Sequence, residues 1–311
     1  MQQITFRAMG CQMQALLDDD SAEASEALDQ VPGWFEEWEQ ALSRFRADSE
    51  LSRLNARGGQ AVPVSLALWE VVELAFTAAR ETGGLVTPTQ LAALEAAGYN
   101  QTFDDLPKDA AAGTEWLTPA PAPDLAQAVE RDAQRRTLRL ASGVRLDLGG
   151  VAKGWAADQA ARRLSSVGPA LVDAGGDIAV SDPRAGGLPW AVGVANPFFA
   201  DGELETLRIA AGAGVATSGR DYRRWQRNGH WYHHILDPRT GLPAVTDVLT
   251  ATVVGPSAAR AEAAAKVALI VGSQAGLAWL GARPEFAACL VLEDGRQVRT
   301  ANLAQYMANE E

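Results

Sequence analysis

The chain is most informative at residues 146–154, which read Leu-Asp-Leu-Gly-Gly-Val-Ala-Lys-Gly. The pattern predicts an apolar strand that ends in a carboxylate, a turn through two glycines and the start of a helix. Glycines let a backbone come close to phosphate oxygens, and a helix N-terminus offers unpaired N–H groups. Because Lys153 adds a full positive charge, the run predicts a cradle for a phosphate-bearing ligand.

The run matches neither of the two common nucleotide motifs, because its spacing is not G-x-G-x-x-G and not G-x-x-x-x-G-K-[ST]. For the run taken alone, a tight structural corner with a surface lysine remains an equal alternative. A second strand-to-glycine turn follows at residues 173–178, Asp-Ala-Gly-Gly-Asp-Ile. It has no adjoining lysine, so we interpret it as structural.

Composition limits the classes of protein that the chain can form. With 311 residues, 47% hydrophobic and 21% charged, it describes a globular protein of one large domain or two small ones. A net charge of −12 gives no general attraction to nucleic acid or to an anionic membrane, so local positive groups must hold any phosphate. The two cysteines, Cys11 and Cys289, argue against a disulfide scaffold and against a four-cysteine zinc site.

The N-terminal residues, Met-Gln-Gln-Ile-Thr-Phe-Arg, show neither a basic region nor an apolar stretch of signal-peptide length. No run of roughly 18 apolar residues occurs, so we expect no integral membrane segment. As given, the chain is expected to be cytoplasmic or a trimmed mature form.

Hydrophobic spacing predicts three helices in the first hundred residues. They lie at about 21–42, with a break at Pro32-Gly33, at 65–84, with Ser65 as N-cap, and near 88–97. Residues 100–124 are rich in Asp, Pro, Ala and Thr, which indicates a surface connection or an insertion. Strands at 137–140 and 144–148 are then expected to form a hairpin that delivers the glycine pair.

Short strands are expected in the rest of the chain at 190–194, 204–209, 215–217, 231–235 and 248–254. A helix is expected at 257–271, and a late hairpin around Asp294-Gly295. Strands and helices alternate irregularly, which favours an α+β fold over a doubly wound parallel sheet. We therefore expect mixed or antiparallel sheets with flanking helices.

Several runs together resemble the FAD:protein FMN transferase family of ApbE-like proteins. In order, they are Ala8-Met9-Gly10, Ser43-Arg44-Phe45 with Ser49 to Asn55, Asp147 to Gly154, Asp173 to Ile178, Ala216 to Gly219 and His233 to Gly241. Their order covers nearly the whole chain. The resemblance implies one two-lobed α+β domain over residues 1–311, which binds FAD. With Mg²⁺ it would transfer the FMN half to a threonine or serine hydroxyl of an acceptor protein and release AMP. Members of the family are often exported or lipid-anchored.

The resemblance also implies roles for particular residues. His234 and Asp237 are the catalytic candidates. The candidates for contact with the flavin nucleotide are Met9, Phe45, Leu85, Val86, Thr87, Asp147, Gly149, Gly150, Lys153, Ser218, His233 and Ile235. The sequence departs from the family at 85–87, where the family often reads Phe-Asp before the Pro-Thr pair.

The candidate metal site departs further. In the family, a late helix offers an aspartate and, one turn on, a threonine or serine, with a backbone oxygen from the glycine run, here Gly150. This chain has Glu262 and Lys266 instead. A glutamate four residues before a lysine lies on the same helix face and can pair with it, so Mg²⁺ would compete with Lys266. We hypothesise that the chain keeps the flavin pocket with a lysine in the metal's place. The alternative is an exposed helix pair that contributes about 0.2–0.5 kcal/mol.

Other features have structural alternatives. His230, His233 and His234 are close in sequence, but neighbouring strand residues point to opposite faces, which favours structural or pocket roles over a metal site. Residues 237–241 could form only a turn. The arginines between 220 and 227 form either a solvated loop or a patch for an acidic partner or phosphate.

Three functions remain open at this point. The first is FMN transfer to an acceptor protein. The second is flavin binding without transfer, because of Glu262 and Lys266. The third is hydrolysis of FAD to FMN and AMP.

Overall fold

The computed structural model describes residues 1–106, 109–110, 118–199, 202–210, 212–227 and 229–307. The chain divides into two compact units. Unit 1 comprises Met1–Phe35, Lys153–Asp221 and Thr246–Glu311, and unit 2 comprises Glu36–Ala152 and Tyr222–Val245. Each unit is described by itself. Of the predicted connection at 100–124, residues 107–108 and 111–117 lie outside the described residues.

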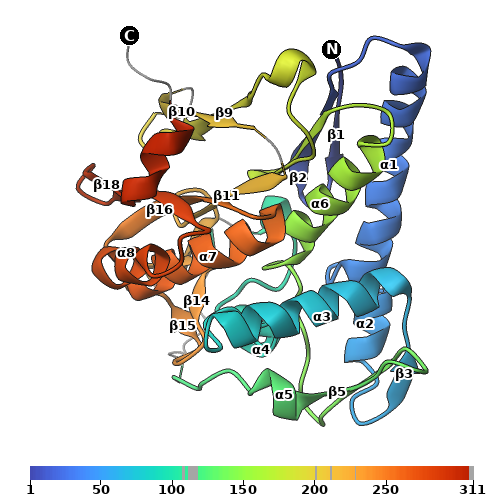
Figure 1. Cartoon of the computed structure of the whole chain (residues 1–311). Helices are drawn as coiled ribbons and strands as arrows, with labels where there is room; N and C mark the ends of the chain where they lie inside the picture. Colours follow the sequence, from blue (N-terminus) through green and yellow to red (C-terminus); the bar gives the residue numbers. More distant parts are fainter. Residues whose placement is uncertain (107–108, 111–117, 200–201, 211, 228, 308–311) are drawn as a thin grey trace. The chain divides into compact units, whose positions relative to one another are not determined.

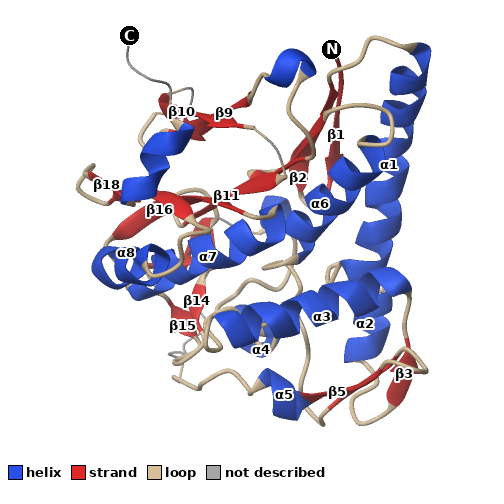
Figure 2. Ribbon diagram, viewed as in Figure 1, coloured by secondary structure: helices blue, strands red, loops and turns tan. Residues whose placement is uncertain are grey.

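Unit 1 is built on an eight-stranded sheet in the order β1-β2-β7-β8-β11-β16-β17-β18 (Figures 1 and 2). The strands are β1 Gln2–Ala8, β2 Cys11–Leu17, β7 Ala170–Ala174, β8 Asp177–Val180, β11 Ala213–Gly219, β16 Val248–Gly255, β17 Ala287–Leu292 and β18 Gln297–Arg299. All neighbours in this sheet pair antiparallel. The predicted α+β class is therefore confirmed.

Helix α7 (Ala258–Val271) packs on β11 and β16, and α8 (Ser273–Gly281) packs on α7 and β17. Helix α7 begins as predicted, because the Ser257 hydroxyl accepts a hydrogen bond from the Arg260 N–H at 3.2 Å. It is buried on nearly all sides, as its apolar composition requires. Helix α6 (Ala152–Leu164) approaches it closely, since a Cβ added at Gly154 would lie 2.6 Å from Ala259 Cα.

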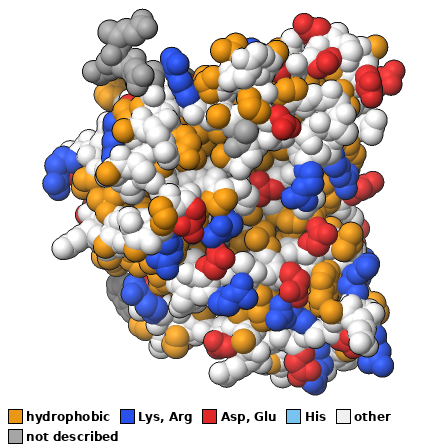
Figure 3. Space-filling model, in the orientation of Figure 1, with side chains coloured by type: hydrophobic (Ala, Val, Ile, Leu, Met, Phe, Trp, Pro, Cys, Tyr) orange, Lys and Arg blue, Asp and Glu red, His pale blue; other side chains and the backbone are white. Residues whose placement is uncertain are grey.

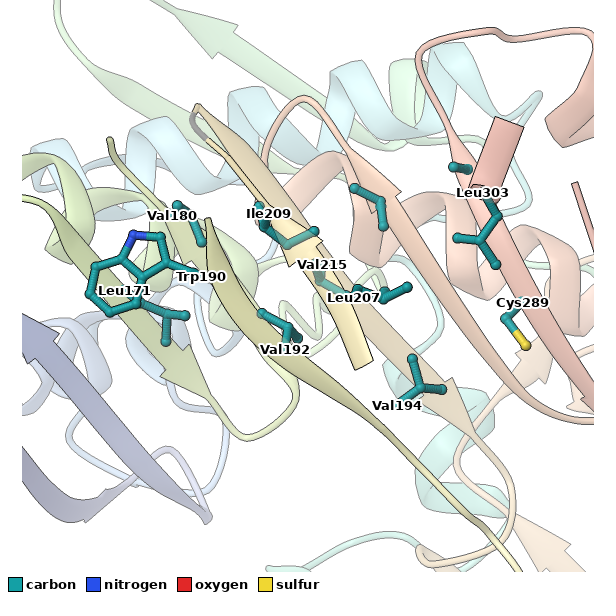
Figure 4. Packing of buried hydrophobic residues seen from close by; sticks show 12 residues of the cluster. Leu171, Val180, Trp190, Val192, Val194, Leu207, Ile209, Val215, Cys289 and Leu303 are labelled. Atoms are coloured by element: carbon teal, nitrogen blue, oxygen red, sulfur yellow. The ribbon is translucent and has the colours of Figure 1, made fainter. Parts of the chain in front are cut away.

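A second layer of the core in unit 1 lies between the sheet and a two-stranded ribbon, β9 (Trp190–Ala195) and β10 (Glu203–Ile209). Figure 4 shows its buried side chains, which come from the ribbon, from the large sheet and from the 3₁₀ helix η3 (Ala301–Tyr306). The alternating burial of β9 is typical of a strand with one face on a core. A further 3₁₀ turn, η2, spans Ala185–Gly187.

Unit 2 combines short helices with small sheets. The helices are α2 Glu50–Asn55, α3 Leu66–Glu81, α4 Leu91–Ala96, α5 Leu125–Ala128 and the 3₁₀ turn η1 Phe103–Asp105. The strands are β3 Ala61–Pro63, β4 Asp109–Ala110, β5 Val129–Asp132, β6 Thr137–Leu140, β12 Arg224–Arg227, β13 His230–His233, β14 Leu236–Asp237 and β15 Leu242–Pro243. They form sheets in the orders β3-β6-β5, β13-β12-β4 and β14-β15. Ser65 caps α3 as predicted, because its hydroxyl accepts from the Leu68 N–H at 3.2 Å.

Helix α1 (Ala22–Leu42) runs through Pro32 without the predicted break. A proline inside a helix costs about 3 kcal/mol. The helix nevertheless keeps a buried apolar stripe on both sides of the proline, formed by Leu28, Val31, Phe35, Trp38 and Leu42. Each such side chain contributes about 1.5–3 kcal/mol on burial, so burial outweighs the local cost.

The predicted hairpin of 137–140 with 144–148 is also wrong. Strand β6 pairs with β3 and β5, and residues 144–148 form no strand. The Asn55 side chain instead donates to the Leu146 carbonyl at 2.9 Å and accepts from the Leu146 N–H at 2.8 Å. The Asp147 N–H donates to the Pro88 carbonyl at 2.8 Å. A side chain and a loop carbonyl thus satisfy the backbone that a strand partner would otherwise have satisfied.

On the face drawn in Figure 3, acidic and basic side chains are intermingled. Among the described residues, no helix is both long enough and apolar enough to cross a membrane.

Candidate functional site

Four charged side chains meet in unit 1, and we call them the charge quartet: Lys153, Asp177, Glu262 and Lys266. Lys153 lies in the first turn of α6, and Asp177 is the first residue of β8. Glu262 and Lys266 lie one turn apart on α7. The quartet therefore joins the first glycine corner, the second glycine corner and the late helix of the sequence.

The contacts within the quartet are direct. The Lys153 ammonium forms an ion pair with Asp177 Oδ2, and its Nζ lies 3.9 Å from Glu262 Oε1. Lys266 Nζ donates to the same Glu262 oxygen at 2.8 Å. The other oxygen, Glu262 Oε2, accepts from the Gly154 N–H at 3.2 Å. Both oxygens of Glu262 therefore have positive or donating partners.

Burial differs between the two kinds of charge. The Asp177 and Glu262 side chains are 2% and 1% exposed, whereas both lysine side chains are 16% exposed. Burial opposes ionisation of Glu262, but the charges of Lys266 and Lys153 outweigh it and lower the pKa of this carboxyl. Burial, reinforced by the charge of Glu262, raises the pKa of Asp177 to about 6 in spite of Lys153. For Lys153, the nearby carboxylates outweigh burial and raise the pKa.

One sequence-based interpretation is corrected by this geometry. Glu262 is buried, so Glu262 and Lys266 are not an exposed helix pair. The second glycine corner has no lysine of its own, but Lys153 from the first corner pairs with its Asp177, and the structural role of this corner stays a prediction. The sequence could not show this pairing because the two residues belong to different corners.

The first corner has the predicted turn at the start of α6. Asp147 Oδ1 accepts from the Gly149 N–H at 2.7 Å, and a Cβ at Gly149 would lie 2.9 Å from that oxygen. Gly149 leaves room for this carboxylate, and it is not among the residues with positive φ. Gly150 follows it in the turn before α6.

A second set of side chains meets in unit 2, and we call it the arginine–aromatic cluster: Arg44, Phe45, Tyr99, Asp147 and His234. Arg44 forms an ion pair with Asp147, and its Nη2 donates to the Tyr99 carbonyl at 2.8 Å. Its guanidinium carbon lies 4.0 Å from the Phe45 ring centre and 4.8 Å from that of Tyr99. The Tyr99 ring is 6.5 Å from the His234 ring.

This cluster contains three residues implied by the family resemblance, Phe45, Asp147 and His234. Arg44 is 6% exposed and Phe45 is 39% exposed, so a buried cation holds an aromatic ring that remains open to solvent. The Tyr99 ring stacks on the ring of the buried Trp225, with 5.5 Å between the ring centres, and this contact restrains Tyr99.

The other candidates of unit 2 lie in the loop at residues 85–87 and at the end of β13 and the residues after it. Val86 is buried beside the half-buried Leu85, and the Thr87 hydroxyl lies 2.8 Å from that of Thr89. His233 is buried, with Nε2 3.2 Å from the Ala244 carbonyl, and the neighbouring Ile235 is buried too. His234 is half-buried, and its Nδ1 lies 3.4 Å from the Arg223 carbonyl.

Asp237 is engaged by Arg239 on its own turn. Arg239 donates from Nε and Nη2 to the two carboxylate oxygens at 2.9 and 2.7 Å. The Asp237 carbonyl also accepts from Thr240 and Gly241, so residues 237–241 do form a turn. Burial opposes ionisation of Asp237, but the bonds from Arg239 prevail and lower its pKa, which makes it a weak base.

The two remaining candidates lie in unit 1. Met9 occupies the β1–β2 turn with φ of +47°, in the left-handed region that non-glycine residues rarely adopt. Ser218 is buried on β11, two residues beyond Ala216, the cross-strand partner of Asp177.

The residues at the candidate metal site do not fit Mg²⁺. Magnesium needs octahedral oxygen ligands, and among the described residues no group of three or more His, Cys, Asp or Glu side chains could hold a metal. Glu262 is occupied by the ammonium of Lys266. No divalent cation is therefore assigned to this arrangement.

Sequence reasoning missed Arg44, Tyr99 and Asp177 as site residues. Arg44 and Asp177 lie inside motifs that carry the family resemblance, and Arg44 directly precedes the candidate Phe45. Tyr99 follows α4 and carried no sequence signal, because its contact with Arg44 joins distant parts of unit 2.

The chain is an α+β protein built on an eight-stranded antiparallel sheet. Two solved structures share the fold: the ApbE protein of Thermotoga maritima (TM-score 0.86, 24% identity, 99% of both chains) and the apo form of Pseudomonas stutzeri flavinyl transferase ApbE (TM-score 0.79, 23% identity, 100% of this chain and 97% of the other).

Two relatives identified by sequence are FAD:protein FMN transferases. The FAD:protein FMN transferase of Treponema pallidum is 32% identical over 94% of this chain and 84% of the relative. That of Vibrio cholerae is 30% identical over 78% and 72%, respectively. The model of the ApbE family matches residues 9–290, and the chain belongs to this family.

Proposed function

We propose that the protein is an FAD:protein FMN transferase. The observation that carries the proposal is the 32% identity, over 94% of the chain, to a relative with that name. Family membership over residues 9–290 supports it. The substrates are then FAD and an acceptor protein with a threonine or serine hydroxyl.

The reaction exchanges one phosphorus–oxygen bond for another. The acceptor hydroxyl oxygen attacks the phosphorus of the FMN half, and the bond from this phosphorus to the bridging oxygen breaks. AMP leaves with the bridging oxygen, and the hydroxyl proton passes to a base. Such transfers depend on positioning and on neutralising the charge of the phosphates.

Particular residues suit these tasks. In unit 1, the lysines of the charge quartet supply positive charge for phosphate oxygens. In unit 2, the exposed ring of Phe45, held by Arg44, offers a stacking surface to an aromatic ligand. Arg239 already occupies the Asp237 carboxylate, which disfavours Asp237 as the base and leaves His234 as the other catalytic candidate.

The products of one incubation test the proposal. The purified protein is mixed with FAD and an acceptor domain of the family, and the acceptor is analysed by mass spectrometry. FMN transfer is expected to add the mass of FMN less one water and to release one AMP per acceptor.

The same incubation separates the two alternatives, which the named relatives do not favour. Free FMN and AMP, without a mass gain, would indicate an FAD hydrolase. Bound FAD without any product would indicate a flavin-binding protein, and either result would overturn the proposal.

A further inference from the structure

In the charge quartet, the lysine side chains are more exposed to solvent than the carboxylates. The carboxylates are already paired, so a divalent cation would gain little binding energy there. Both lysine side chains retain 16% of their exposure, while the two carboxylates beneath them are almost fully buried. The lysine side chains are therefore the more exposed members of the quartet, and the carboxylates are the more deeply buried ones.

The carboxylates are already neutralised. Glu262 Oε1 lies 2.8 Å from Lys266 Nζ and 3.9 Å from Lys153 Nζ, and Asp177 pairs with Lys153. A divalent cation at Glu262 would have to displace one ammonium and remain beside the other. Two positive charges and two negative charges leave the quartet neutral without a metal.

An ammonium group can take over part of a metal's task at a phosphate. It carries a full charge and three N–H donors, and Lys266 is held in place by its bond to Glu262. Charge-assisted hydrogen bonds to phosphate are among the stronger polar contacts in proteins.

We propose that Lys266, held by Glu262 and assisted by Lys153, binds the pyrophosphate of FAD in place of a divalent cation, so that this chain works without Mg²⁺. The inference rests on the proposed function for the identity of the ligand. In the transfer step, Lys266 donates hydrogen bonds to phosphate oxygens as the bond to AMP breaks, and keeps its own protons.

The first experiment measures FAD affinity by quenching of tryptophan fluorescence, in Mg²⁺ and in EDTA. The affinity of the unaltered protein is expected to agree between the two buffers within about twofold. Lys266→Met should weaken binding in EDTA by about tenfold or more, because a charge-assisted hydrogen bond is lost. Arg260→Met removes a positive charge from the same helix, where Arg260 pairs with Glu285, and should leave the affinity unchanged.

The second experiment restores room for a metal. Lys266→Thr frees a Glu262 oxygen and adds a hydroxyl oxygen, so FAD binding should become dependent on Mg²⁺ by about tenfold. Calorimetry with Mg²⁺ alone should detect binding to Lys266→Thr and none to the unaltered protein. If Lys266→Met is unfolded by circular dichroism, the double variant Glu262→Gln, Lys266→Met, which removes both charges, takes its place.

The outcomes separate the inference from the proposed function. An affinity of the unaltered protein that rises about tenfold with Mg²⁺, or direct Mg²⁺ binding to it, overturns the inference alone. FAD binding that is independent of Mg²⁺ but weakened by Lys266→Met, without transfer to an acceptor, supports the binding role of Lys266 and overturns both the function and the role of Lys266 in transfer. Absence of FAD binding in both buffers overturns both.

Discussion

Lys153 is the member of the charge quartet whose ammonium lies within ion-pair distance of both carboxylates. A buried pair that loses one partner leaves an uncompensated charge in a poorly solvated place. Removal of both partners avoids that penalty. The quartet is therefore expected to tolerate paired changes better than single ones.

Lys153→Met should lower the free energy of unfolding by about 3–5 kcal/mol, because Asp177 is left buried without its partner. The double variant Lys153→Met, Asp177→Asn should recover most of that loss. Urea unfolding of the two single variants and the double variant measures the coupling. Additive losses would contradict the pairing.

Asp177 also predicts a dependence of stability on pH. Its pKa in the folded protein is raised from 3.8 to about 6, by burial first and by Glu262 second. Between these values the folded state holds a proton that the unfolded state has released. The contribution of Asp177 to the free energy of unfolding therefore falls as the pH rises from about 4 to about 6, by at most about 1.4 kcal/mol per unit, and levels off above its folded-state pKa.

Unfolding of the unaltered protein and of Asp177→Asn across this range measures the contribution of that carboxyl. The difference between the two curves should change below pH 6 and stay constant above it. Parallel curves throughout would show that Asp177 does not titrate in this window.

At the scale of elements, the sequence predicts the start of a helix correctly where a side chain caps it, and a turn correctly where glycine occupies it. Ser65 and Ser257 cap α3 and α7 as predicted, and the late hairpin turns at Asp294-Gly295 between β17 and β18. Such signals act within a few residues, so the sequence contains them fully.

Elements governed by distant partners were predicted less well. Burial of both halves of α1 overrides Pro32, and Asn55 holds residue 146 outside any strand. The order of motifs predicted the family and the members Lys153, Glu262 and Lys266 of the quartet. It did not predict Asp177 as their partner, because this contact joins the first turn of α6 to the first residue of β8 and forms only in the folded chain.

The closeness of α6 to α7 gives a prediction at this scale. In Gly154→Ala, the new methyl group would lie 2.6 Å from Ala259 Cα and 2.7 Å from its nitrogen, so one helix must move. We expect a loss of about 1–3 kcal/mol in the free energy of unfolding. Gly281→Ala in α8 is the matched control, because nothing lies within 4 Å of its new methyl group.

Thermal or urea unfolding of the two glycine variants measures the difference. Gly281→Ala should be neutral or stabilise the protein by up to about 1 kcal/mol. Equal effects of the two substitutions would show that the helices do not pack as closely as described.

At the scale of the whole molecule, the net charge of −12 is the dominant feature. Nonspecific binding to nucleic acid requires clusters of positive charge that release counterions from the phosphates. The acidic and basic side chains on the face in Figure 3 are intermingled instead. We predict that no nucleic acid partner exists.

A gel-shift titration with a short DNA duplex and a short RNA at physiological salt checks this prediction. No retarded band should form at micromolar protein concentration. Retardation that weakens steeply with added salt would show a positive surface that the net charge conceals.

The left-handed backbone conformation at Met9 favours glycine, but glycine would lack the side chain that is a candidate for contact with the flavin. A residue with a Cβ in this region costs about 1–2 kcal/mol, which glycine avoids. Met9→Gly should therefore yield a protein that resists urea slightly better but holds FAD less well, if the thioether touches the flavin. If Met9→Gly is more stable and binds FAD with unchanged affinity, the Met9 side chain does not contribute to FAD recognition.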